Sequence, residues 1–205
     1  MRKTLIGFLL IGLLVSAMPV WADAVDDGLP SGVNEQVRTQ TREMIQAGVP
    51  TDEAVKMTRN MVQHQFRNEV ALQAQDEVID ACRQGLPHEP LMSKLQEGLA
   101  KQVPPEKVVQ AMKTVRERYA YAYRYAKQVT TDKTAQKALG EALSQGLAAG
   151  LQTRDMDRIN EQVRERTRSK TCGDCPQLAL QSALAARDMA RLGVASDTTG
   201  DVVCG

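Results

Sequence analysis

The residues best suited to chemistry lie near the carboxyl-terminal end, where Cys172 and Cys175 are separated by two residues and followed by Pro176. Such a cysteine pair can be redox-active, supply half of a metal site or close a local disulfide. A thioredoxin-like pair belongs to a strand–helix unit, and no segment of this sequence has a strand pattern. A haem attachment motif has histidine where Pro176 stands. The disulfide is the favoured interpretation, because the chain is predicted below to be exported.

The cysteine set has two further members, Cys82 and Cys204. Four cysteines in an exported chain are typical of two structural disulfides, and they allow three pairings. The loop between Cys172 and Cys175 is short and easily closed, so we expect these two to pair with each other. Cys82 would then pair with Cys204 and tie down the carboxyl terminus, which otherwise frays.

A second candidate site consists of Met57, Met61 and His64, which share one helix face at i, i+4 and i+7. Thioether and imidazole groups are ligands for copper(I), so this set could bind that metal. Methionines at helical spacing more often fill a hydrophobic core, and core packing is the favoured interpretation. We find no hydrolase triad, phosphate-binding loop or pair of catalytic carboxylates. The sequence therefore favours a protein without a cofactor and without enzymatic activity.

Four tyrosines alternate along the segment 119–125, inside a predicted helix. Residues four apart share a helix face, so Tyr119 and Tyr123 lie roughly opposite the other two tyrosines. A continuous apolar line passes through Tyr119 and predicts that its side faces the core. Tyrosine beside cations on the other side has the composition of a contact surface. The predicted interaction patch consists of Tyr121, Tyr125, Arg118 and Lys127. The alternative is that a neighbouring helix covers both tyrosines of this patch.

The first 22 residues have the three parts of a secretory signal peptide: a basic head, an apolar segment over 5–15, and a cleavage site after Ala22 or Ala24. The apolar segment is shorter than the about 20 residues that span a membrane, so we expect no stable membrane anchor. After cleavage, 24 basic residues are balanced by 25 acidic ones, which argues against a nucleic-acid partner. We expect a periplasmic or secreted protein whose partner is an unidentified protein.

A short phrase recurs where helices are predicted to end: a glycine or glutamine, an apolar residue, often a proline, and soon an acidic residue. Glycine just past a helix end adopts the left-handed conformation, and the apolar residue after it folds back onto the last turn. The residues that follow suit the first turn of another helix. The phrase therefore predicts helix–corner–helix joints. They begin at Gly48, Gly85, Gln102, Gly150 and Gly193.

These joints are 37, 17, 48 and 43 residues apart, and the unequal spacing disfavours a regular array such as tetratricopeptide or ankyrin repeats. The segment 51–84 lacks glycine and proline and is expected to form one helix. We predict an all-α fold, an irregular bundle or stack of six to seven helices. A single domain is expected over 33–205, after a loose leader at 23–32.

The phrases GLPHEPL and EGLAKQVPPE, within about 85–109, resemble sequences of uncharacterised exported helical proteins of bacteria with GLP- and GVP-type corners. The resemblance implies no particular activity. Three functional hypotheses remain. The favoured one is a non-enzymatic interaction or scaffold protein whose tyrosine-bearing face contacts a partner. The others are a thiol–disulfide or metal-handling protein that uses Cys172 and Cys175, and a periplasmic holdase chaperone.

Overall fold

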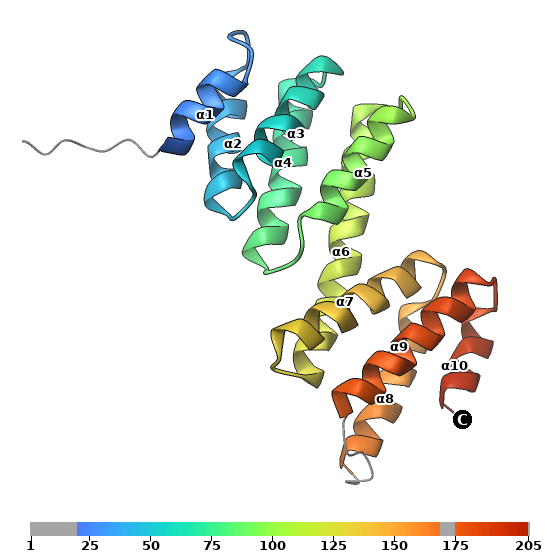
Figure 1. Ribbon diagram of the computed structural model, residues 1–205. Coiled ribbons are helices and arrows are strands. Elements are labelled where there is room, and N and C mark those ends of the chain that lie inside the picture. Colours follow the sequence, from blue (N-terminus) through green and yellow to red (C-terminus); the bar gives the residue numbers. More distant parts are fainter. Residues whose placement is uncertain (1–19, 169–174, 205) are drawn as a thin grey trace, which may run out of the picture.

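The computed structural model describes residues 20–168 and 175–204, and every regular element in these ranges is an α-helix (Figure 1). The predicted all-α fold is confirmed, with ten helices in these ranges rather than six to seven. The helices are α1 (Val20–Gly28), α2 (Glu35–Gln46), α3 (Thr51–Gln63), α4 (Asn68–Arg83), α5 (Glu89–Ala100), α6 (Pro105–Val129), α7 (Lys133–Ala148), α8 (Thr153–Arg168), α9 (Cys175–Arg191) and α10 (Ser196–Cys204). Within the same ranges, none of them combines the length and the apolar composition that crossing a membrane requires.

All five predicted joints are helix corners of one kind. At Gly48, with a φ of 109°, the glycine amide donates a hydrogen bond to the carbonyl oxygen of Ile45. The next amide, that of Val49, donates to the carbonyl oxygen of Met44 at 3.1 Å. These two bonds satisfy carbonyl groups that the helix end leaves unpaired. The same pair of bonds closes the corners at positions 85, 102, 150 and 193.

A sixth corner, at Gln65, divides the segment that was expected to be one helix. Gln65 has a φ of 56°, and the Phe66 amide donates to the carbonyl oxygen of Met61 at 3.0 Å. Phe66, the residue after the left-handed one, is buried, as expected of the apolar residue that folds back onto the last helical turn. The prediction of one helix over 51–84 is therefore wrong. A left-handed glutamine takes the place of glycine here, so the pattern of the other corners does not reveal this one.

With Gln65 included, the corners from 48 to 102 follow a regular period. Gly48 and Gly85 are 37 residues apart, and so are Gln65 and Gln102. Each period contains two helices, α3 with α4 and then α5 with α6. Buried positions repeat at the same offset, as Val78 of one period and Val115 of the next illustrate. The irregular spacing inferred from sequence is thus corrected for this part of the chain, which is a helical-hairpin repeat.

We expect Gln65→Gly to raise the free energy of unfolding by about 0.5–1 kcal/mol. A side chain in the left-handed conformation costs about 1–2 kcal/mol, which exceeds the conformational entropy that glycine loses on folding. Gln73→Gly is the matched control, because Gln73 is exposed inside α4 and its replacement should destabilise by about 1 kcal/mol. Urea denaturation of both variants provides the measurement. Equal destabilisation by both would show that Gln65 is not strained.

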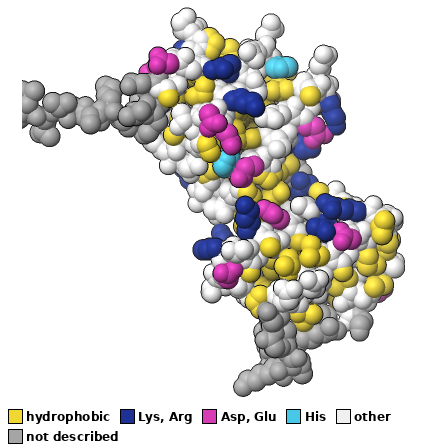
Figure 2. Space-filling view, in the orientation of Figure 1, with side chains coloured by type: hydrophobic (Ala, Val, Ile, Leu, Met, Phe, Trp, Pro, Cys, Tyr) yellow, Lys and Arg dark blue, Asp and Glu magenta, His cyan; other side chains and the backbone are white. Residues whose placement is uncertain are grey.

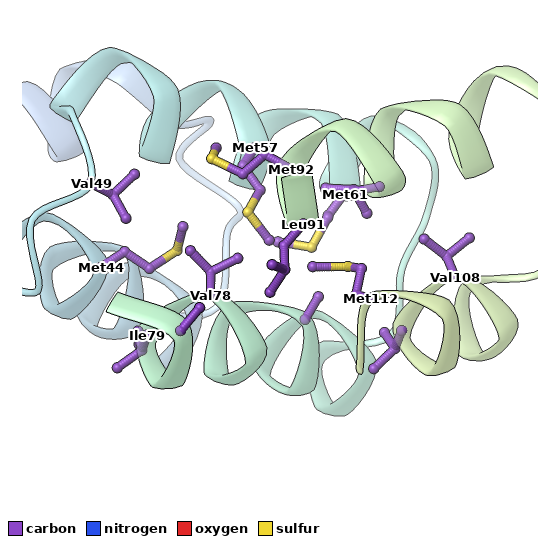
Figure 3. Close-up of a cluster of buried hydrophobic side chains, with 14 of the residues drawn as sticks. Met44, Val49, Met57, Met61, Val78, Ile79, Leu91, Met92, Val108 and Met112 are labelled. Atoms are coloured by element: carbon purple, nitrogen blue, oxygen red, sulfur yellow. The ribbon is translucent and has the colours of Figure 1, made fainter. Parts of the chain in front are cut away.

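The repeat stacks the second helix of each hairpin side by side, so that α2 contacts α4 and α4 contacts α6. Between these helices and α3 and α5 lies a hydrophobic cluster rich in methionine (Figure 3). Met44, Met61 and Met112 in this cluster are fully buried. Flexible methionine side chains fill irregular spaces between helices, and the chain offers few aromatic residues for that purpose. The cluster forms the core of the upper half of the molecule in Figure 1.

A second hydrophobic cluster lies among α7, α8, α9 and the carboxyl-terminal half of α6. Here α7 packs on α9, and α8 packs on α10. With 25 residues, α6 is about 37 Å long, enough to serve both clusters. Tyr119 and Tyr123 belong to the first cluster, whereas Tyr125 belongs to the second. The molecule therefore has two lobes joined along α6, with a waist between them (Figure 2).

The segment 23–32 is not a loose leader. It contains most of α1 and the turn after it, and both Val25 and Leu29 are buried against Val55 of α3. The buried guanidinium group of Arg38 donates to the carbonyl oxygens of Leu29 and Pro30. The sequence does not reveal these contacts, because only two apolar residues, Val25 and Leu29, make them, and two residues four apart are too few to show a helical pattern.

Candidate functional site

A groove crosses the waist along the carboxyl-terminal half of α6. It has a volume of about 700 Å³. Its floor is apolar and consists of Leu86, from the corner after α4, with Ala120 and Tyr123 of α6. Exposed or half-buried polar residues of α6 recur along it at steps of three and four, so that one helix face supplies most of the lining. These polar residues are Arg116, Glu117, Tyr121, Arg124, Lys127 and Gln128.

Two cations hold the groove wall to the end of α4. Arg116 donates from Nε to Glu77 Oε2 at 2.6 Å, and this hydrogen bond, together with the charge of Glu77, raises the pKa of Arg116 further above its usual range. Lys127 donates from Nζ to the carbonyl oxygen of Gln84 at 3.1 Å. A cation at this position satisfies a carbonyl at a helix carboxyl terminus, where the helix dipole favours positive charge. The groove is therefore built on a fixed junction between two helices.

Tyr121 joins the groove to the lower lobe. Its hydroxyl lies 2.5 Å from Asp157 Oδ1 and 3.3 Å from the carbonyl oxygen of Thr153, both in α8. Burial, and then the hydrogen bond to Asp157, raise the pKa of Tyr121, so the hydroxyl stays protonated. The guanidinium carbon of Arg124 lies 5.6 Å from the centre of the Tyr121 ring, within the range of a cation–π contact. That contact orients Arg124 over the groove.

The second tyrosine of the predicted patch, Tyr125, is in the core. Its side chain is only 7% exposed and packs in the second hydrophobic cluster. Its hydroxyl is buried without a hydrogen-bond partner among the described residues, and burial raises the pKa of Tyr125 to about 12. The expectation that Tyr125 projects to solvent beside Tyr121 is wrong, because α8 and α9 supply a second core that covers it. Arg118 is half-buried and does not line the groove.

We expect Tyr121→Phe to lower the free energy of unfolding by about 1 kcal/mol, because it removes a hydrogen bond to a carboxylate. Tyr125→Phe should leave the stability unchanged or raise it slightly, since the hydroxyl that it removes is buried and unpaired. Urea denaturation of the two variants compares one chemical change in two environments. A larger loss for Tyr125→Phe than for Tyr121→Phe would contradict this assignment.

A smaller hollow of about 320 Å³ continues from the groove toward α8. Tyr121, Arg124 and Gln128 line both depressions. In the smaller hollow, Arg164 pairs with Glu161 at 3.8 Å. Asp157 accepts a hydrogen bond from the neutral Tyr121 hydroxyl and keeps its negative charge in a hollow that Arg124 also lines. The smaller hollow therefore lengthens the groove and adds one carboxylate near Arg124.

The cations of the groove are not equally compensated. Glu77 balances Arg116, and Glu117 places a further negative charge at the same end. At the other end, Arg124 and Lys127 have no carboxylate partner in the part of the chain that the structure describes. Both are exposed. The groove consequently has one neutral to acidic end and one cationic end, separated by the apolar floor, and the two cations of that end outnumber the single carboxylate of Asp157 in the adjoining hollow.

The predicted metal ligands are separated by burial. Met57 is 2% exposed and Met61 is fully buried, and both pack in the methionine-rich cluster (Figure 3). His64 is exposed at the end of α3, next to the Gln65 corner. Among the described residues, no three His, Cys, Asp or Glu side chains are grouped so that they could hold a metal ion.

Of the four cysteines, the structure describes the side chains of Cys82 and Cys204, which lie in different parts of the molecule. Cys82 is a half-buried free thiol against the first cluster, and burial raises its pKa. Cys204 packs against the second cluster, so the expected pairing of Cys82 with Cys204 is not present. Cys172 and the side chain of Cys175 are outside the described residues. Their predicted disulfide and their redox or metal alternatives stay predictions.

Of the predicted patch, Tyr121 and Lys127 line the groove. Sequence reasoning missed Arg116 and Arg124, which also line the groove. Arg124 is three residues after Tyr121 on the same helix face, so extending the patch by one helical step would have found it. Arg116 is five residues before Tyr121 and is not reached by such a step. Leu86 could not have been found in this way, because only the packing of the α4 corner against α6 brings it to the groove.

Comparisons of the chain with protein-family models, with curated protein sequences and with solved structures gave no match. The function must therefore be inferred from the chemistry of the groove itself.

Proposed function

We propose that the protein is an exported, non-enzymatic interaction or scaffold protein that binds a protein partner in the groove along α6. The observation that carries the proposal is the open groove itself, about 700 Å³ in volume, with an apolar floor and a polar rim. Small-molecule sites bury most of their ligand in a concave pocket, whereas protein segments bind along open grooves on helical scaffolds. The signal-peptide pattern of the first 22 residues supports a periplasmic or secreted location.

Two properties of the groove suit recognition rather than catalysis. Arg116 and Lys127 are tied to α4, and Tyr121 is tied to α8, so the lining is held before a partner arrives. Preorganised side chains lose less conformational entropy on binding. Tyrosine and arginine, which occur together at Tyr121 and Arg124, are the residue types that contribute most at protein interfaces.

Filling the groove tests the proposal. Ala120 is half-buried on the groove floor, so Ala120→Leu should add a side chain where the partner binds. The matched control is Ala148→Leu, an identical change at an exposed site on α7. We expect both variants to melt like the wild type, and only Ala120→Leu to lose partners that co-purify with the tagged protein from its native cells, as identified by mass spectrometry. Equal recovery of every partner with both variants would refute the groove as the binding site.

A further inference from the structure

The cationic end of the groove contains two groups arranged to receive an anion. The guanidinium carbon of Arg124 lies 5.6 Å from the centre of the Tyr121 ring, and this cation–π contact uses none of its N–H donors. Lys127 Nζ uses one donor for the carbonyl oxygen of Gln84 and has two more. The two residues are three apart on α6, about 4.5 Å along the helix axis. One carboxylate can therefore contact both.

The apolar floor indicates what is attached to that carboxylate. Leu86, Ala120 and Tyr123 line the groove between the cationic end and the end that carries Glu117. The lining from 116 to 128 covers roughly 18 Å of helix, which is the length of about five extended residues. An inorganic anion would leave most of this length empty, whereas an extended peptide fills it. Glu117 disfavours a second acidic side chain at the far end.

We propose that the groove binds an extended peptide segment of a protein partner in which one carboxylate contacts Arg124 and Lys127 and a neighbouring apolar side chain covers Ala120. This inference rests on the proposed function and specifies the partner's chemistry. Charge complementarity selects an acidic segment at one end, and the apolar floor selects an aliphatic or aromatic residue beside it. Because Arg124 and Lys127 are exposed, added salt should weaken the complex.

The test uses a displayed library of random heptapeptides, selected on the purified protein. Enriched peptides should share one Asp or Glu with an apolar residue two or three positions away. Their dissociation constants should rise about tenfold or more in the double variant Arg124→Gln/Lys127→Gln, since a charge-assisted hydrogen bond contributes about that factor. The control, Lys56→Gln/Lys137→Gln, removes the same charge from exposed lysines outside the groove and should change nothing.

The outcomes separate this inference from the proposed function. Enriched peptides that lack an acid, or that bind the Arg124→Gln/Lys127→Gln variant as tightly as the wild type, overturn the inference. If Ala120→Leu still abolishes their binding, the groove remains the peptide site and the proposed function survives. If no peptide is enriched, or if Ala120→Leu has no effect, both are overturned. A last outcome is that replacing the peptide's apolar residue leaves its affinity unchanged and that sodium sulfate, at constant ionic strength, displaces the peptide. That result would reveal a small-anion site and would also overturn the inference.

Discussion

Gly140→Ala should lower the free energy of unfolding by about 2 kcal/mol, although alanine is the better helix former. Gly140 lies inside α7, where that helix packs on α6. A Cβ atom at this position would lie 2.4 Å from two carbon atoms of the Tyr123 ring. A contact this short forces the ring or the helix to move, and overpacking of this kind costs about 1–3 kcal/mol. The cost exceeds the roughly 1 kcal/mol that alanine gains inside a helix.

The control is Gly146→Ala in the same helix. There the added Cβ meets mainly a terminal methyl group of Leu151, at 2.8 Å, and that group can rotate away. We expect Gly146→Ala to be neutral or slightly stabilising by urea denaturation. Combining Gly140→Ala with Tyr123→Leu should recover part of the loss, which a double-mutant cycle measures as a coupling energy. Additive effects of the two changes would contradict the packing of Tyr123 against Gly140.

Gln75→Ala should lower the free energy of unfolding by about 3 kcal/mol. The Gln75 side chain is fully buried between α2, α3 and α4, and its Nε2 donates to Thr41 Oγ1 at 2.9 Å and to Thr58 Oγ1 at 3.0 Å. The two threonine hydroxyls also bond each other at 2.9 Å. Truncation therefore leaves a cavity and removes hydrogen bonds from a buried polar cluster. Alanine substitution of an exposed α4 residue would cause neither loss.

The repeat predicts how this loss can be reversed. At an offset of 37 residues, the polar cluster of α2, α3 and α4 corresponds to three buried apolar residues of α4, α5 and α6. These residues are Val78, Leu95 and Met112. The triple variant Thr41→Val/Thr58→Val/Gln75→Met copies their apolar character and should unfold within about 1 kcal/mol of the wild type, because all partners of the hydrogen bonds are removed together. A triple variant as unstable as Gln75→Ala would contradict the equivalence of these two sites one period apart.

The sequence predicted the helical class and the corners because both depend on local chemistry. A glycine past a helix end and the apolar residue after it suffice to specify the two hydrogen bonds found at Gly48, Gly85, Gly150 and Gly193. The corner at Gln65 could not be recognised by the same rule, because glutamine is strained there and the burial of Phe66 is what holds it. Missing that single corner concealed the 37-residue period and lowered the expected number of helices.

The site was predicted only in part. Helical periodicity correctly separates Tyr119 from Tyr121, but it cannot tell which faces of a helix other helices cover. Tyr125 is covered because α6 is long enough to enter a second core, which is a tertiary property. The predicted metal ligands are also separated by tertiary packing, because Met57 faces the core whereas His64 follows the end of α3.

The claim that a protein partner binds in the groove along α6 is tested most directly by site-specific photo-crosslinking in the native cells. A benzoylphenylalanine in place of Glu117, which is exposed and lines the groove, should give a discrete crosslinked product with one partner. The same residue in place of Glu69, exposed at the start of α4 and outside the groove, should give none. Ala120→Leu in the same chain should abolish the product. Crosslinking that is equal from both positions, or absent from Glu117, would contradict the claim.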